Sequence, residues 1–569
     1  MCRYPALAVF DPSPKTSRRL LLAIIAAGAV LRAIGLRWGL PYEFHPDETT
    51  IVTLGAGAAE GRLNPGWFIY PSLQIYEAAA LGVIAHWLEA SRDWVVFALR
   101  ALVAAQGVAT IPLVYVLGRR LWSRSAGLAA AAVLAGLGAA VLHAHYGVTD
   151  VPIGFLTLAS TVVAIRAVDR GAYRLALYAA VLTGLAATTK YSAAPQLLIP
   201  LLAAWFATRA GGARRPRRVA ATLLLVPVFA AVFVMGTPYA VLDHLTFREH
   251  LSLEAEWQLH AQAGAHMPAA EDLPLSRRGV GQIPLLLWSD LGPVALGVIV
   301  VGFIVAIAGP ILRSRRPTAA AGALPAERER FAASWFPLLW TVVYLALLLP
   351  SAKVEQRYLV PIYPFLALFG GRGAVALAAL LSSAWKQNQV TAGRLALAGV
   401  MAATLAWPGR EAIKVDRLLA RPDSRIAARQ WILDHLPPGA GVACDFYAPP
   451  LSKSDGLRVL RSPFTIASQQ LSWYCRHGYS HVVISSMTYN RFFQDPSLRF
   501  VPARAWYRRL GRAGKRLVAF PGEELGFHDP TIKVYRLTAC SGDSLLPAGA
   551  SSPNMRSDST TQSPSPRAP

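Results

Sequence analysis

The sequence predicts a polytopic α-helical membrane protein with about eleven transmembrane helices, followed by a small α/β domain. Of its 569 residues, 54% are hydrophobic and only 15% are charged, and the mean hydropathy is +0.38. Soluble domains carry about 25% charged residues. The apolar residues gather into runs close to the roughly 20 residues that cross a bilayer, and short basic clusters separate these runs.

Eleven apolar runs are candidate spans. They comprise residues 20–38, 95–117, 126–143, 151–168, 174–188, 195–208, 219–236, 283–308, 333–350, 358–382 and 393–407. The run 73–90 is nearly long enough to be a twelfth. Its Glu77, His86 and Glu89 favour a helix that lies at the membrane interface instead.

The basic clusters predict the orientation of the chain. They are Lys15/Arg18/Arg19, Arg119/Arg120/Arg124, Arg166/Arg170/Arg174, Arg209/Arg214/Arg215/Arg217/Arg218, Arg313/Arg315/Arg316 and Lys386/Arg394. Each cluster falls in every second inter-span segment, so the positive-inside rule places the amino terminus in the cytoplasm. The same placement explains the net charge of +24 through topology and membrane lipid, and no nucleic-acid partner is indicated.

After about residue 408 the sequence loses its membrane character. An amphipathic run, RIAARQWILDHLPPGAGV, precedes the β-rich pieces GVACDF, HVVISS and IKVYRL, which together predict an extracytoplasmic α/β domain. The predicted parts are a cytoplasmic amino terminus (1–19), a transmembrane domain (20–410) with a first outer loop (39–94), the α/β domain (411–540) and a disordered tail (541–569).

Four cysteines occur, three of them in the C-terminal part. The sequence contains no CxxC motif, so neither a zinc knuckle nor a redox dithiol is indicated. The cysteine spacing does not determine whether Cys444 and Cys475 form a disulfide.

Acidic residues of the outer segments are the candidate catalytic groups. Asp47 and Glu48 follow the first span closely, and Asp150 begins the fourth span in HAHYGVTDVPIG. If the two loops meet, one carboxylate can act as a general base toward a sugar hydroxyl while a second orients the acceptor or holds a metal ion. The alternative is that they are solvated acids or, for Asp150, a helix cap.

Cations on the same face are the candidate substrate-binding groups. Lys190 and Tyr191 end the fifth span, and Arg357 and Tyr358 open the tenth. They lie on the outer side, so the positive-inside rule does not explain them. A cation at the headgroup level suits a phosphate held at the interface, and a guanidinium matches phosphate oxygens well. Snorkelling toward lipid headgroups is the alternative.

The sequence does not determine whether the protein binds a metal ion. Imidazole is a common metal ligand, but His45, His143, His145 and His244 show no HExxH-like spacing. If a divalent metal ion is used, the candidate ligands are His45, Glu48 and Asp150. Tyr70 belongs to an aromatic-rich stretch for which the interfacial aromatic belt is a sufficient explanation, with sugar binding as the alternative.

Several segments together resemble a known family. They are FHPDE after the first span, YPSLQIY before the second, HYGVTDVP at the fourth, then KYSAAPQLLIP and EQRYLVPIYPFLAL. In this order and sidedness they resemble the membrane glycosyltransferases of the GT-C superfold. The family in question is family 39, the protein O-mannosyltransferases and the aminoarabinose transferase of lipid A. The resemblance covers about residues 20–410, and WILDHLPPGAGV, HVVISS and KVYRL look like the tail domain of bacterial members.

The resemblance implies a polyprenyl-phosphate-linked sugar as donor, a lipid, glycan or protein acceptor, and inverting transfer at the outer face of the inner membrane. By resemblance Asp47 is the general base, Glu48 its acidic neighbour and Asp150 the second-loop acid. Arg357 then lies near the lipid phosphate, with Lys190 as a second candidate.

One departure limits the resemblance. Relatives of the lipid A branch have Glu-Lys before the proline of the interfacial segment, where this chain has Ile69 and Tyr70 before Pro71. The departure puts metal dependence and the same donor and acceptor in doubt. Other classes considered are a transporter or flippase of a polyprenyl-linked glycan and a non-catalytic scaffold. Ionisable residues at span ends rather than mid-membrane favour the enzyme.

Overall fold

The computed structural model describes residues 11–260, 278–314, 325–383, 389–494 and 500–538. The chain divides into two compact units. The first, here called the membrane unit, comprises Met1–Ala427 together with Gly522–Pro530, and the second, the sheet unit, comprises Ala428–Pro521 and the residues from Thr531 onward. The predicted disordered tail (541–569), Cys2 and Cys540 lie outside the described residues.

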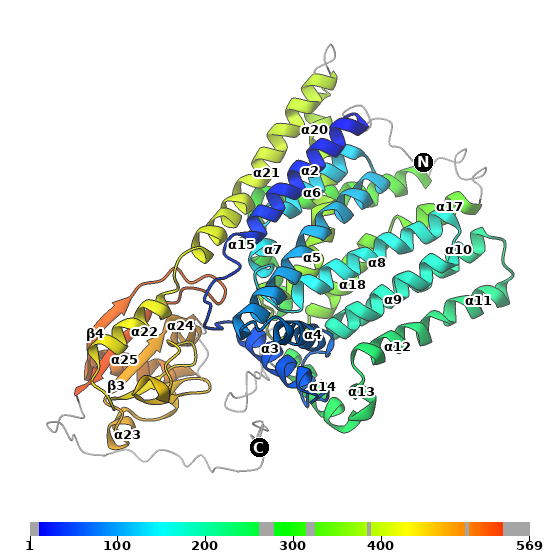
Figure 1. Cartoon of the computed structure of the whole chain (residues 1–569). Coiled ribbons are helices and arrows are strands. Elements are labelled where there is room, and N and C mark those ends of the chain that lie inside the picture. Colours follow the sequence, from blue (N-terminus) through cyan, green and yellow to red (C-terminus); the bar gives the residue numbers. More distant parts are fainter. Residues whose placement is uncertain (1–10, 261–277, 315–324, 384–388, 495–499, 539–569) are drawn as a thin grey trace. The chain divides into compact units, whose positions relative to one another are not determined.

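Helices make up the membrane unit. They are α2 (Pro14–Ala33), α3 (Pro46–Ala59), α4 (Leu73–Trp87), α5 (Arg92–Leu121), α6 (Arg124–Ala135), α7 (Gly138–His143), α8 (Asp150–Arg170), α9 (Tyr173–Thr189), η1 (Tyr191–Leu197), α10 (Leu198–Ala210), α11 (Arg215–Leu223), α12 (Leu225–Gly236), α13 (Tyr239–Leu242), α14 (His244–His260), α15 (Gly279–Ser314), α17 (Pro325–Ala333), α18 (Phe336–Leu348), α19 (Gln356–Leu359), η3 (Val360–Ile362), α20 (Tyr363–Ser382) and α21 (Gln389–Leu419). Figure 1 shows α8, α9 and α10 running side by side.

Seven helical stretches of the described residues are long and apolar enough to cross a membrane. They are Arg92–Leu121, Asp150–Arg170, Arg215–Gly236, Gly279–Ala308, Arg328–Leu348, Gln356–Ser382 and Gln389–His435. The polytopic helical fold is therefore confirmed, whereas the predicted number of about eleven spans is not. The other predicted spans correspond to α2, α6 with α7, α9 and α10, which are shorter or carry more charge. The predicted interfacial run forms α4, whose 15 residues fall short of a span.

Three of the predicted basic clusters, those around Arg120, Arg170 and Arg209, lie at one end of the unit. Asp169 of α8 and the neighbouring residues Glu329 and Arg330 of α17 connect them. Arg120 Nε lies 2.6 Å from Asp169 Oδ2, and Arg330 Nη2 lies 2.9 Å from the Asp169 carbonyl oxygen. Arg209 Nε lies 3.1 Å from Glu329 Oε1. Arg100 and Arg120 are both on α5, so at 1.5 Å per residue they are about 30 Å apart, which is the thickness of the hydrocarbon core.

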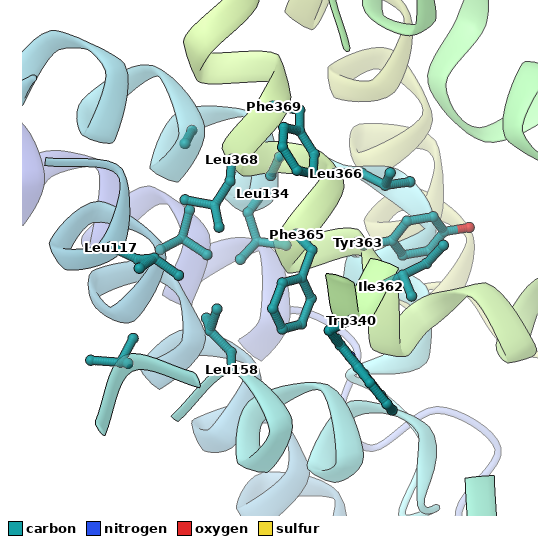
Figure 2. Packing of buried hydrophobic residues seen from close by; sticks show 14 of the residues in the cluster. Leu117, Leu134, Leu158, Trp340, Ile362, Tyr363, Phe365, Leu366, Leu368 and Phe369 are labelled. Atoms are coloured by element: carbon teal, nitrogen blue, oxygen red, sulfur yellow. The ribbon is translucent and has the colours of Figure 1, made fainter. Parts of the chain in front are cut away.

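Large apolar side chains of α20 fill the centre of the membrane unit. Phe365 and Leu368 are fully buried, and Figure 2 shows them among Leu134 of α6 and Leu117 of α5. A helix that is apolar on most of its faces is expected in the interior of a bundle. α20 thereby connects α19 and η3, which precede it in the chain, to the core.

The sheet unit has the predicted α/β character. Its strands are β1 (Gly441–Cys444), β2 (Arg458–Arg461), β3 (His481–Ser485), β4 (Gly514–Phe520) and β5 (Ile532–Leu537), in the order β2-β1-β3-β5-β4. β1 pairs in parallel with β2 and β3, and β5 is antiparallel to β3 and β4. Four helices accompany the strands, namely α22 (Ser424–His435), α23 (Leu471–Arg476), α24 (Ser486–Gln494) and α25 (Val501–Ala513).

The three predicted β-rich pieces form β1, β3 and β5. Every residue of β1 and β3 is buried, as expected for strands that have parallel neighbours inside a sheet. The more polar β2 and β4 were not predicted, because both lie at sheet edges and lack a continuous apolar run. Cys444 is a free, buried thiol in β1, so the bridge to Cys475 is not formed.

Close backbone approach between α15 and α20 leads to a stability prediction. A Cβ atom on Gly373 would lie 1.9 Å from the Val298 carbonyl oxygen, and one on Gly302 would lie 1.8 Å from that of Phe369. We expect Gly373→Ala to separate the helices and to destabilise the protein by about 1–3 kcal/mol. Thermal unfolding in detergent measures this. Gly297→Ala is the matched control, because no atom lies within 4 Å of its added Cβ, and an equal loss in both variants would contradict the prediction.

Candidate active site

The first outer loop delivers two adjacent acids to the start of α3. His45 is the N-cap residue, and Pro46 occupies the first helical position, where its missing N–H costs nothing. Asp47 and Glu48 follow in the first turn, where the helix dipole favours negative charge. Successive helical residues point about 100° apart. The two carboxylates therefore face different surroundings.

Asp47 is the acid that stays accessible. Its side chain is 25% exposed and forms an ion pair with Arg357 of α19. The Tyr70 hydroxyl donates to Asp47 Oδ2 over 3.1 Å. Burial opposes ionisation of Asp47, but Arg357, His45 and the Tyr70 hydroxyl together outweigh it, and the pKa of Asp47 is lowered. Burial raises the pKa of Tyr70, so its hydroxyl stays a donor. Asp47 is thus an ionised, partly solvated carboxylate held from two sides.

Asp150 and Lys190 form a second acid–cation pair. Lys190 Nζ lies 2.6 Å from Asp150 Oδ1, and the Asp150 side chain is only 3% exposed. Asp150 is the first residue of α8 and makes no capping hydrogen bond, since the N-cap position belongs to Thr149. The lysine follows the last residue of α9 in an extended conformation, which directs the chain away from the helix axis.

Tyr358 and Tyr70 connect the two pairs. Lys190 Nζ lies 5.0 Å from the centre of the Tyr358 ring and 6.0 Å from that of Tyr70. The Arg357 guanidinium lies 5.4 Å from the same Tyr358 ring. Cations within about 6 Å of a ring face are attracted to it. The predicted residues Asp47, Tyr70, Lys190, Arg357 and Tyr358 therefore share one site, and Asp150 joins them through Lys190.

Glu48 points into the protein instead. Its carboxylate receives two hydrogen bonds from Arg100 of α5, at 2.8 and 2.6 Å, and a third from the Gly147 N–H at 2.7 Å. Both side chains of this ion pair are fully buried. Burial opposes ionisation of Glu48, but Arg100, His45 and the Gly147 N–H together outweigh it, so the pKa of Glu48 is lowered. With its oxygens occupied and no exposure, Glu48 is placed to hold the loop rather than to touch a substrate.

Tyr191 contacts the segment between α3 and α4 at Phe68. Its hydroxyl donates to the Phe68 carbonyl oxygen over 2.8 Å, and the Phe68 N–H donates to His250 Nδ1 over 3.0 Å. Its ring also packs against Phe247 of α14 at a centroid distance of 6.0 Å. Tyr191 therefore positions the loop that carries Tyr70.

The donor set does not fit a metal ion. Among the described residues, no group of three or more His, Cys, Asp and Glu side chains is placed to hold one. Of the three predicted ligands, Glu48 is bound to Arg100 and Asp150 to Lys190. His45 Nδ1 accepts the Glu48 N–H at 3.5 Å, and burial lowers the pKa of His45, which keeps the imidazole neutral. Each acid thus already has a protein cation where a metal would bind.

Three charged residues near the site escaped prediction. Glu355 pairs with Arg357 at 2.8 Å and with Lys353, and although burial opposes its ionisation these cations lower its pKa to about 2. Glu254 of α14 accepts from Gln258 Nε2 over 2.9 Å, and the same Nε2 donates to the Tyr358 hydroxyl over 3.4 Å, which links Glu254 to the site. Burial raises the pKa of Glu254. Arg100 could have been recognised, because a charge inside an apolar helix is rare and usually has a defined partner. No pattern in the sequence marks Glu254.

A site of this kind suits chemistry that needs a base and an anion-binding surface together. Asp47 provides an ionised carboxylate, and Arg357 with Lys190 provides two cations close to it. Phosphate oxygens would compete with the carboxylates for these cations, since a guanidinium binds both anions well.

Residues 84–238 match the family model described as dolichyl-phosphate-mannose-protein mannosyltransferase. No curated protein matches the chain. Among solved structures, the apo oligosaccharyltransferase of Archaeoglobus fulgidus is similar, with a TM-score of 0.50, 12% identity, and coverage of 84% of this chain and 70% of that one. ArnT from Cupriavidus metallidurans bound to undecaprenyl phosphate aligns over 92% of this chain and 98% of its own, at 12% identity and a TM-score of 0.47.

These comparisons confirm the predicted resemblance to GT-C membrane glycosyltransferases. The family model covers residues 84–238, and at 12% identity the similarity to the oligosaccharyltransferase shows a shared multi-pass membrane fold.

The buried Glu48–Arg100 pair gives a prediction that separates support from catalysis. Glu48→Gln leaves a buried guanidinium without its counter-charge, so we expect a loss of about 3–5 kcal/mol in unfolding free energy. Because the pKa of Glu48 is lowered in the folded state, its stabilisation is present above the ordinary carboxyl pKa of about 4.3 and is lost as the pH falls.

Thermal unfolding between about pH 2 and pH 7, followed by tryptophan fluorescence, measures both effects, because the loss falls below the ordinary carboxyl pKa. Glu60→Gln is the matched control, since Glu60 and its partner Arg62 are 63% and 70% exposed and such surface pairs contribute at most about 1 kcal/mol. Equal stability of wild type and Glu48→Gln would contradict the structural role.

Proposed function

We propose that this GT-C-type membrane protein is an inverting glycosyltransferase that moves a sugar from a polyprenyl-phosphate donor to an acceptor at the extracytoplasmic face. The observation that carries the proposal is the accessible Asp47 carboxylate, bound to Arg357 and Tyr70 beside the Asp150–Lys190 pair. The description of the matching family model, which names a dolichyl-phosphate sugar, supports this donor class.

The proposed orientation in the inner membrane places the amino terminus in the cytoplasm and the sheet unit outside. Its support is the distribution of basic residues, three clusters of which meet at one end of the membrane unit. Asp47 is close to the Arg100 end of α5, about 30 Å from the Arg120 end. The site is then at the outer surface, where the phosphate of a lipid carrier lies.

Arg357 and Lys190 bind the donor phosphate in this proposal. Both cations already contact the face of Tyr358, which keeps their side chains extended toward one site. In an inverting transfer the bond from the anomeric carbon to the phosphate oxygen breaks, and negative charge collects on the phosphate. Two fixed cations stabilise this charge in the transition state.

Asp47 takes the proton of the acceptor hydroxyl as the new glycosidic bond forms on the opposite face of the sugar. In the free protein Arg357 keeps Asp47 a weak base, because it lowers the pKa of the carboxylate. When a donor phosphate binds Arg357, part of this effect is removed and Asp47 becomes more basic. Donor binding thereby prepares the base before the acceptor arrives.

Asp150 and Tyr70 have positioning roles in this scheme. Asp150 holds Lys190 in place, and Tyr70 holds the Asp47 carboxylate through its hydroxyl. Tyr70 occupies the segment in which the lipid A branch carries its Glu-Lys pair. The site therefore has a neutral hydroxyl where that branch has charge, and a different sugar or acceptor is expected.

Asp47→Asn tests the proposed base. It keeps the size and hydrogen-bonding capacity of the side chain but removes the proton acceptor, so we expect transfer to fall by about 10²–10⁴-fold while donor binding persists. Purified protein is supplied with labelled polyprenyl-phosphate sugars and a membrane extract, and labelled product is counted. Asp243→Asn is the control, because Asp243 binds Asn64 at the surface, outside the site.

Equal transfer by wild type and Asp47→Asn would overturn the general-base role. If wild type neither transfers the sugar nor binds the donor, the glycosyltransferase proposal itself fails. Transfer that disappears with a chelator and returns with added divalent cation would contradict the metal-independent arrangement of the acids.

The pH dependence of transfer tests the coupling between Asp47 and Arg357. The acidic limb of kcat/KM reports the base in the free enzyme. Without Arg357, burial becomes the dominant influence on Asp47 and raises its pKa. We therefore expect Arg357→Gln to move the acidic limb to higher pH and to raise the donor KM. Lys353→Gln removes a neighbouring cation that is 60% exposed and paired with Glu355, and an equal shift in this control would contradict a specific coupling.

A further inference from the structure

Residues Gly522–Pro530 lie between β4 and β5 in the chain, yet they are part of the membrane unit. We propose that this returning segment positions the Asp47 turn, chiefly through the contact of Phe527 with His45. The inference rests on the proposed catalytic role of Asp47 and assigns to the returning segment a function in the same reaction.

Phe527 lies directly against the residue that begins α3. The centres of the Phe527 and His45 rings are 4.2 Å apart, and the Tyr146 ring lies 4.7 Å from His45. His45 is fully buried and caps α3 by accepting the Glu48 N–H. Asp47 follows two residues later. The orientation of the imidazole, and with it the start of α3, is therefore set by two aromatic rings.

Two hydrogen bonds made by the backbone of Phe527 hold the residue in this position. Its N–H donates to the Tyr146 hydroxyl over 3.4 Å, and its carbonyl oxygen accepts from Arg425 Nη2 over 2.6 Å. Arg425 is oriented in turn by Asp423, with contacts of 2.8 and 2.7 Å. The same guanidinium lies 3.7 Å from the centre of the Phe44 ring, next to His45 in the chain. Arg425 thus contacts both the returning segment, at Phe527, and the residues just before α3, at Phe44.

The residues after Phe527 are equally well anchored. His528 is fully buried, its Nε2 lies 2.8 Å from the Leu418 carbonyl oxygen, and its ring meets Trp38 edge-on at 5.6 Å. Asp529 donates its N–H to Asp423 Oδ2 over 2.9 Å and accepts the Ser424 N–H over 3.0 Å. These contacts hold the end of the segment on Leu418, Asp423 and Ser424, which a simple connection between two antiparallel strands would not require.

Gly526 allows the close approach. Its φ of +57° is a conformation that L side chains rarely adopt, and an added Cβ would lie 2.4 Å from the Tyr146 hydroxyl. Any larger residue would push the segment away from Tyr146 and His45. The positive φ of Gly526 therefore allows the turn to contact Tyr146, which in turn packs against His45.

Phe527→Ala removes the ring from His45 and leaves the site residues unchanged. Displacement of a reacting group by about 1 Å can lower a rate by about 10²-fold. We expect kcat to fall at least tenfold with little change in the donor KM. Amide hydrogen exchange of the full-length protein in detergent should become faster in residues 43–50, and exchange in α15 should be unchanged.

Three further variants keep the experiment decisive. Phe527→Tyr retains the ring and should restore both the exchange rate and kcat. Phe493→Ala makes the same change at a side chain that is 42% exposed on α24, and it should alter neither quantity. Gly526→Ala should reproduce the effect of Phe527→Ala without removing a side chain.

Unchanged exchange in residues 43–50 of both Phe527→Ala and Gly526→Ala would overturn the positioning role, even if Asp47→Asn abolishes transfer. Faster exchange with an unchanged kcat would also overturn it. If Asp47→Asn transfers normally, the proposed function fails separately, and the exchange data alone then show whether the segment orders the loop.

Discussion

The buried ion pair between Glu48 and Arg100 is the interaction on which the rest of the site depends. Two charges removed from water are stable only when each is closely paired and its remaining hydrogen-bonding positions are filled. Here Arg100 also donates to the carbonyl oxygens of Leu36 and Trp38, and the Gly147 N–H completes the Glu48 carboxylate. One pair thus joins the end of the first helix, the start of α3, α5 and the loop before Asp150.

The direction of Asp47 follows from this constraint. With Glu48 directed into the protein, its neighbour on the helix must point elsewhere, and it meets Arg357 and Tyr70. The FHPDE motif therefore contains two acids with different tasks. Glu48 holds the turn, and Asp47 is the acid that stays accessible at the candidate site. A similar division separates the buried Asp150, which holds Lys190, from the partly exposed Asp47.

Acids and cations alternate through the site, and this pattern has a consequence for substrate binding. Glu355, Arg357 and Asp47 form one charged series, and Lys190 with Asp150 forms another, with Tyr358 beside both cations. Such a site is close to neutral before a ligand arrives. In the proposed reaction an anionic donor phosphate competes with the carboxylates for the cations, so donor binding would make Asp47 more basic.

The membrane character, the helical class, the C-terminal α/β domain and the grouping of Asp47, Lys190 and Arg357 could be predicted from the amino-acid sequence. These properties are carried by composition, by the length of apolar runs and by the side of the membrane on which charges fall, all of which are local along the chain. Which acid faces the site could not be predicted, because the two acids differ through a long-range contact. Glu48 pairs with Arg100, 52 residues later in the chain, and Asp47 does not. The same reason applies to Glu254 and Phe527, whose contacts with the site join segments far apart in the chain and leave no mark in either segment alone.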